Sequence, residues 1–262
     1  MTNYGTRSLG TLLALVFASA ACGPNRVAGA HLDPAFQKYI SPDALLVADI
    51  EAAKLRQTAF FHRNQTTLGG ALPASDADRV LLVWNGKGVL IAQQKAPGEP
   101  VRLSGDPALV RRSQELARSG GGNLPEELSG ALASLADADQ IRILLRGLPV
   151  EDLHLPSEYA SLLANFRGHV RRTAVGLEAQ SGLNLHARID CFSTEGSERV
   201  DVALRAGIGF ARLSAIAKDP GEARLYEVLQ VKRDGSSVFI DGKYPPDLSD
   251  DLLRRILLSA RP

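Results

Sequence analysis

The sequence divides at one stretch, Ile141-Arg-Ile-Leu-Leu145, which lies just past the middle of its 262 residues. Its alternating pattern predicts a β-strand whose odd positions form one apolar face. The opposite face carries Arg142 and Arg146, together with Leu144. Two arginines on that face indicate that water reaches it, as in a sheet that helices cover on one side only. We therefore expect this strand to lie centrally in a half-covered sheet.

The residues before this strand predict one α+β unit, at 43–146. A continuous apolar stretch predicts a buried strand, and Asn85-Gly86 between two apolar runs is a strong signal for a β-hairpin. Asp106-Pro107 has the residue types of a helix start. The expected elements are a strand at 45–50, a helix from 52 to about 62, a hairpin of 79–84 with 89–92, a helix from 107 to about 118 and another from Pro125.

The residues from 141 to 262 repeat the same order of elements. The expected elements are the strand at 141–145, a helix at 157–166, a hairpin of 173–180 with 183–191, a helix at 198–217, a hairpin of 227–232 with 237–240 and a C-terminal helix from Asp247 or Ser249. Each half then has the order β-α-β-β-α-β. We predict an α+β fold of two consecutive ferredoxin-like units with antiparallel sheets, helices mainly on one face, and a shared strand that could make the sheet continuous.

The N-terminus has the composition of an export signal. Arg7 precedes a short apolar run at 11–17, and small residues at 18–21 lead to Cys22. A positive start, an apolar stretch and a small-residue cleavage site predict a secretory signal peptide at 1–21. The apolar run is shorter than the roughly 20 residues that span a bilayer.

The residues at the predicted cleavage site carry a family resemblance. Ser19-Ala20-Ala21-Cys22 resembles the lipobox of bacterial lipoproteins of unassigned function. Ser19 stands where Leu is commoner in that motif. The resemblance covers residues 1–23 and implies that Cys22 is acylated and becomes the first mature residue. Residues 22–42 would then form a lipid-anchored tether. Gly23, in place of Asp, implies the outer membrane, with the protein facing the periplasm.

Charge and cysteine content restrict the partners. The formal net charge is +1, and residues after 21 hold 29 basic and 29 acidic side chains, so no overall field attracts nucleic acid. Hydrophobic residues make up 45%, a globular composition. If Cys22 is acylated, Cys191 is the single remaining thiol and no internal disulfide forms. Alternation over 183–191 places Cys191 on a core face, so we predict a buried, unreactive thiol.

No motif predicts a catalytic, cofactor or metal site. The histidines stand singly in the sequence, at positions 31, 62, 154, 169 and 186. His186, Arg188 and Asp190 share the outward face of one predicted strand, which we interpret as solvated because one His and one Asp beside an Arg do not form a zinc site. Acidic pairs such as Glu126-Glu127 lie near helix starts, where the helix dipole accounts for them.

We therefore expect a non-catalytic, lipid-anchored protein that binds an unknown envelope protein at the periplasmic face, with no cofactor and no nucleic acid. One alternative is a carrier of a small apolar ligand held between sheet and helices. In that case the loop 64–78 and the glycine hinge at 119–122 could act as lids. A second alternative is an exported hydrolase without a recognisable motif.

Overall fold

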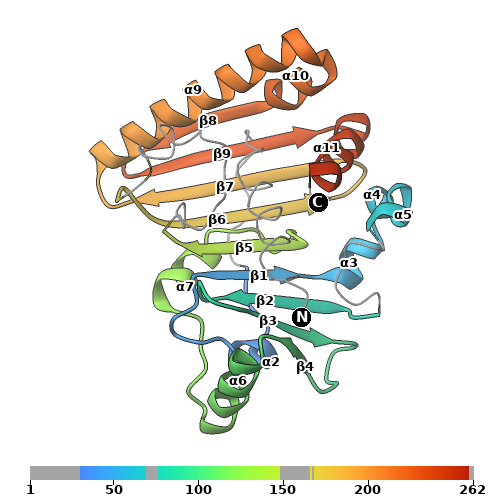
Figure 1. The fold of residues 1–262 in the computed structure, drawn as a ribbon, viewed down its shortest axis with the longest axis vertical. Helices are drawn as coiled ribbons and strands as arrows, with labels where there is room; N and C mark the ends of the chain where they lie inside the picture. Colours follow the sequence, from blue (N-terminus) through green and yellow to red (C-terminus); the bar gives the residue numbers. More distant parts are fainter. Residues whose placement is uncertain (1–29, 69–75, 148–165, 167, 260–262) are drawn as a thin grey trace.

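The computed structural model describes residues 30–68, 76–147, 166 and 168–259, and its nine described strands form one antiparallel sheet (Figure 1). The sheet order is β4-β3-β2-β1-β5-β6-β7-β9-β8. The strands are β1 (Leu46–Ile50), β2 (Arg79–Trp84), β3 (Val89–Gln94), β4 (Arg102–Gly105), β5 (Ile141–Arg146), β6 (Val170–Ala179), β7 (Leu183–Cys191), β8 (Leu229–Asp234) and β9 (Ser237–Tyr244). The described helices are α2 (Pro34–Gln37), α3 (Ala52–Arg56), α4 (Ala59–Arg63), α5 (Gln65–Leu68), α6 (Pro107–Ser119), α7 (Glu126–Leu132), α9 (Thr194–Lys218), α10 (Pro220–Glu227) and α11 (Pro246–Ser259).

The strand that divides the sequence also joins the two halves of the sheet. β5 is fifth in the order, and Ile143 lies opposite Ala48 of β1 on one side and Val175 of β6 on the other. The expected central, shared strand and the continuous sheet are confirmed. Ile143 and Leu145 are buried on one face and Leu144 is buried on the other.

The ferredoxin-like order of strands is wrong. A ferredoxin-like unit would place β3 between β1 and β2, but β1 pairs directly with β2, with Val47 opposite Val83. The helices between these strands, α3 to α5, stand at one end of the sheet (Figure 1), so the described part of this connection does not cross the sheet face. The second half departs in the same way, because β6 follows β5 directly in the sheet.

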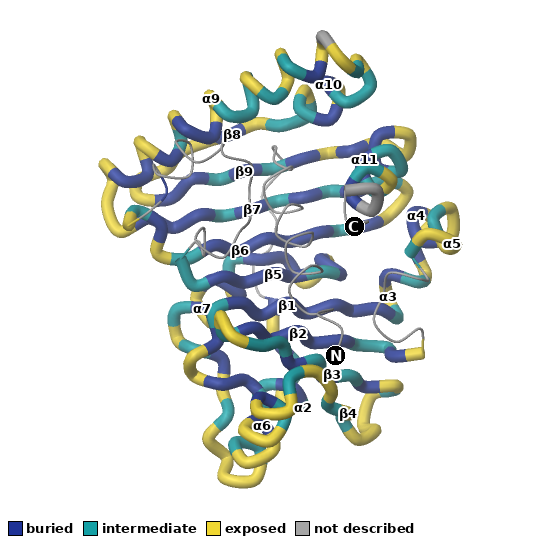
Figure 2. Tube along the Cα trace, in the orientation of Figure 1, coloured by how far each residue is buried: buried dark blue, intermediate teal, exposed yellow. Residues whose placement is uncertain are grey.

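Helices pack on both sides of the sheet as a whole, which corrects the expectation of helices mainly on one face. One apolar cluster includes Ala48 and Ile143 and continues across the sheet to residues of α9 and α11. A second cluster, on the opposite face, includes Val47 and Leu144 and is covered by α2, α6 and α7. It ends at Ala174 of β6. Figure 2 shows the buried residues concentrated along the middle strands.

Local signals place most helix boundaries. The Asp106 carboxylate accepts a hydrogen bond from the backbone N–H of Ala108 at 2.9 Å and caps α6, as predicted. The helix expected at 198–217 begins earlier because Ser193 caps it, accepting from Gly196 N–H at 3.0 Å. The helix expected over 52–62 is divided in two, since Thr58 caps α4 by accepting from Phe61 N–H.

Several expectations fall outside the described residues. These are the signal peptide at 1–21, Cys22 and its tether up to residue 29, and all of the helix at 157–166 except Phe166. β4 was not predicted at all. Among the helices that the structure describes, none is both long and apolar enough to cross a bilayer.

We predict that Ile143→Asp destabilises the whole sheet. The change buries a charge between β1 and β6 without a partner, which we expect to lower the free energy of unfolding by about 4 kcal/mol or more. The control is Lys243→Asp, at an exposed position of β9, which should change it by less than about 1 kcal/mol. Thermal or urea unfolding measures both. Equal effects of the two variants would contradict the central position of β5.

Candidate functional site

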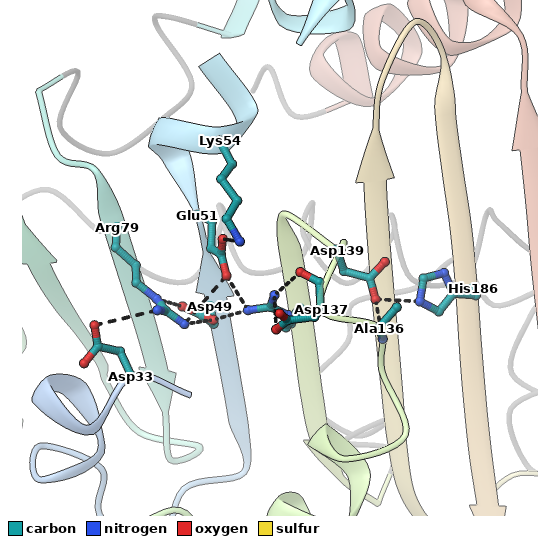
Figure 3. Close-up of polar contacts among 10 residues, drawn as sticks. Asp33, Asp49, Glu51, Lys54, Arg79, Ala136, Asp137, Asp139 and His186 are labelled. Atoms are coloured by element: carbon teal, nitrogen blue, oxygen red, sulfur yellow. Dashed lines mark hydrogen bonds and ion pairs between the residues drawn. The ribbon is translucent and has the colours of Figure 1, made fainter. Parts of the chain in front are cut away.

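A row of charged side chains crosses β2, β1 and β5 on the sheet face that α2, α6 and α7 cover (Figure 3). Arg142 stands at its centre with 1% of its surface exposed. Its Nη1 atom donates to Asp49 Oδ2 at 3.0 Å and to Glu51 Oε1 at 2.8 Å. Its Nη2 atom donates to the backbone carbonyl of Asp137 at 3.0 Å. One guanidinium therefore connects two adjacent strands and the turn before β5.

The row continues on both sides of Arg142. Arg79 of β2 holds Asp49 with two parallel hydrogen bonds, from Nε at 2.8 Å and from Nη2 at 2.7 Å. Asp33, the N-cap of α2, lies 3.7 Å from Arg79 Nη1, and Lys54 of α3 forms an ion pair with Glu51. Three carboxylates therefore meet three cations. We call these six residues the ionic row, listed as Asp33, Asp49, Glu51, Lys54, Arg79 and Arg142.

Pairing outweighs burial for the charges in this row. Burial on its own would raise the pKa of Glu51, but hydrogen bonds from Lys54 and Arg142 hold that pKa below its ordinary value. Burial likewise opposes the charge on Arg79, and its bonds to Asp49 raise its pKa nonetheless. Glu51 and Arg79 therefore keep their charges near neutral pH.

A second buried contact lies across β6. His186 Nε2 of β7 is 2.6 Å from Asp139 Oδ2, and that oxygen also accepts from Ala136 N–H at 3.0 Å. The pair reaches across Gly176 of β6. A Cβ atom at Gly176 would come within 2.3 Å of both Asp139 Oδ2 and His186 Nε2, so only glycine leaves room for this contact.

A third group holds the same face of β6, β7 and β9. Asp190 accepts from Arg172 Nε at 2.6 Å, from Arg188 Nε at 2.7 Å and from Ser237 Oγ at 2.7 Å. Burial would raise the pKa of Asp190, but the bonds from Ser237 and the two arginines lower it. Arg188 also lies over the ring of Phe239, 5.5 Å from its centroid. This carboxylate is shared by two guanidinium groups.

These contacts favour a structural role for the buried charges. The carboxylates of the ionic row and Asp190 are engaged by arginine or lysine, and such pairing leaves an acid poorly suited to take up a proton during a reaction. Within the described part of the chain, no group of three or more His, Cys, Asp or Glu side chains converges as a metal site. The row connects strands that are far apart in the sequence.

The predicted residues have different outcomes. Cys22 lies outside the described residues, so its acylation stays a prediction. Cys191 is buried on β7, as predicted, and burial together with the nearby Asp190 carboxylate raises the pKa of its thiol to about 11. His186, Arg188 and Asp190 do share one face of β7, but the expectation of a simply solvated face is wrong, because all three are bound to other side chains.

The ionic row was missed, although the sequence carried a signal for it. Asp49 and Glu51 flank Ile50 at the end of an otherwise apolar strand, and Arg142 interrupts another. A carboxylate in a strand that is buried on both faces needs a cation within reach. The expectation that water reaches the Arg142 face of β5 is also wrong, because α2 and α7 cover that face and Asp49 and Glu51 neutralise the arginine.

A different surface feature lies on the long helix α9. The described large apolar residues with high exposure are Phe192, Val202, Phe210, Leu213 and Ile216, and four of these five belong to α9. The opposite side of the helix is already packed, since Val200 and Leu204 are buried against the sheet. We call the exposed side, from Val202 to Ile216, the α9 ridge.

Comparison with known proteins assigns this chain to no family. No family model matches the chain, and no curated protein matches it. Among solved structures, it is similar to a chain titled "Structure of crystal form I of TP0453", at 10% sequence identity and a TM-score of 0.45. The match covers 88% of this chain and 99% of that one. A similarity of this size supports no argument about function.

We predict that Arg142→Met is strongly destabilising. It removes the buried cation that Asp49 and Glu51 share and leaves Asp49 with Arg79 and Glu51 with Lys54, so one negative charge in the row is uncompensated, which we expect to cost about 3–5 kcal/mol in the free energy of unfolding. Adding Glu51→Gln should recover part of that loss, because one uncompensated charge disappears. Arg254→Met, at an exposed ion pair, is the control and should cost less than about 1 kcal/mol. Urea unfolding tests all three, and a benign Arg142→Met would show that the row is not needed.

We predict that Cys191 reacts slowly in the folded protein. Its thiol is buried and its raised pKa keeps it protonated at neutral pH, so a bulky thiol reagent should label it only after unfolding. Mass spectrometry of native and urea-treated protein measures this. Rapid labelling of the native form would overturn the buried assignment.

Proposed function

We propose that this protein is a non-catalytic lipoprotein of the bacterial envelope, anchored through acylated Cys22, that binds a partner protein through the α9 ridge. The ridge is the observation that carries the proposal. Water-soluble surfaces scatter their exposed apolar residues singly, whereas a row of them on one helix is typical of an interaction site. The expected place is the periplasmic face of the outer membrane.

The distance between anchor and body supports a membrane-bound role. The described body begins at Ala30, whose backbone N–H donates to the Leu135 carbonyl at 3.2 Å. Ala30 is eight positions after Cys22, so even a fully extended tether reaches at most about 29 Å. An acylated Cys22 would hold the body close to the lipid headgroups, where other envelope proteins are concentrated.

The buried charges support the non-catalytic part. The most deeply buried acids are engaged by positively charged partners or by a histidine, and their contacts join neighbouring strands. Contacts of this kind hold neighbouring strands in fixed positions, so the sheet on which α9 packs is a rigid support. Binding through an exposed apolar ridge needs such a support, because a surface that is ordered before binding loses less entropy on association.

We predict that Cys22→Ser abolishes membrane attachment. Acylation needs the thiol, and two or more acyl chains give stable anchoring where one does not. Fractionation of cells that produce the full chain should move the variant from membranes to the soluble fraction, or leave it unprocessed at a higher mass. Cys191→Ala is the matched control and should stay in the membrane. A membrane-bound, normally processed Cys22→Ser form would refute the anchor.

A further inference from the structure

The α9 ridge has the spacing of a helix–helix seam. Its residues Val202, Ala206, Gly209, Leu213 and Ile216 follow one another at intervals of four, three, four and three. Apolar or small residues at that spacing line one side of a helix and pack against a second helix. All five positions are exposed or partly exposed in the described chain. The partner that fits this pattern is therefore another helix.

Gly209 points to the shape of that partner. Glycine inside a helix weakens it, so a central glycine calls for a reason. Nothing in the described part of the chain provides one, because a Cβ atom at Gly209 would meet no atom within 4 Å apart from its own stretch of helix. On the exposed side, however, Gly209 and Ala206 leave a shallow region, followed along the helix by the large side chains of Leu213 and Ile216.

This sequence of small and large residues complements itself. We propose that the partner of the α9 ridge is α9 of a second copy of this chain, packed antiparallel about a two-fold axis near Ala211. In that register Leu213 faces Gly209 of the second copy, and Ile216 faces its Ala206. Each large residue meets a small one in both directions. The two exposed Phe210 rings lie side by side next to the axis.

Charges beside the axis are already compensated. Arg212 would lie near Arg212 of the second copy there. In each chain, however, Arg212 Nη2 is already 2.9 Å from Glu227 Oε1 of α10. Arg205, further along the same edge, is paired with Asp201 at 2.9 Å. Neither arginine brings an unneutralised charge to the interface, so repulsion between like charges is small.

The size of the seam indicates that the membrane contributes. From Val202 to Ile216 the helix advances about 21 Å, so the seam is smaller than a standard interface of about 800 Å² per partner. Confinement of two anchored copies to one membrane raises their effective concentration. A two-fold axis perpendicular to the membrane also leaves both anchors on the same side. The inference therefore rests on the proposed lipid anchor.

Cysteine cross-linking tests the register. The full chain is produced in cells, and the membrane fraction is treated with a short bis-thiol reagent. Phe210→Cys places two thiols about 3 Å apart along the helix axis, whereas Val202→Cys, equally exposed, places them about 27 Å apart. We expect a cross-linked dimer from Phe210→Cys and none from Val202→Cys or the parent chain. Adding Gly209→Met to Phe210→Cys should abolish the dimer without lowering the thermal midpoint.

Each other outcome has a definite meaning. Membrane-bound Phe210→Cys without a dimer would overturn the self-association, and equal cross-linking at both positions would overturn the antiparallel register. A dimer that survives Gly209→Met would overturn the role of the small residues. If the parent chain is instead found in the soluble fraction, the anchor of the proposed function fails. Cross-linking of soluble Phe210→Cys protein at high concentration, with Val202→Cys as the control, then decides the interface separately.

Discussion

The fold depends on one buried guanidinium, that of Arg142 in the central strand. β5 joins the two halves of the sheet, and its two faces are buried by different means. On one face Ile143 packs among apolar side chains, while on the other Arg142 binds Asp49 of β1 and Glu51, the residue that follows β1. A cation at this position is tolerated only because β1 and the residue after it bring two carboxylates to it. The helices α2 and α7 can therefore cover this face of β5 only when β1 is paired with β5.

At β6 the same sheet face changes from apolar and covered by helices to polar. As far as Ala174 it lies under helices and carries an apolar cluster. Beyond that point it carries His186, Arg188 and Asp190, which are held by contacts within the sheet. The absence of a side chain at Gly176 lets Asp139 reach across to His186. Contacts between polar side chains thus replace apolar packing as the means of fixing β7 relative to the turn before β5.

Features encoded by neighbouring residues could be predicted, and features encoded by distant ones could not. The hairpin at Asn85-Gly86 and the capped start of α6 depend on a few adjacent residues, and both are present. The order of strands depends on whether a connection crosses a face or stands at an end, which the residues of α3 to α5 do not reveal. Arg142 was read as facing water because its partners come 91 and 93 positions earlier in the chain.

Contacts within one chain explain the buried charges, but they do not explain the α9 ridge. Arg142, Asp49 and Gly176 each have a reason within the protein, since the contacts of one chain account for them. Val200 and Leu204 likewise account for the attachment of α9 to the sheet. Neither Gly209 nor the exposed Leu213 contributes to that attachment, and the fold would hold with a polar residue at either position. An apolar seam that the monomer does not use is explained by what binds it, and the alternation of small and large residues along this seam fits a second copy of itself.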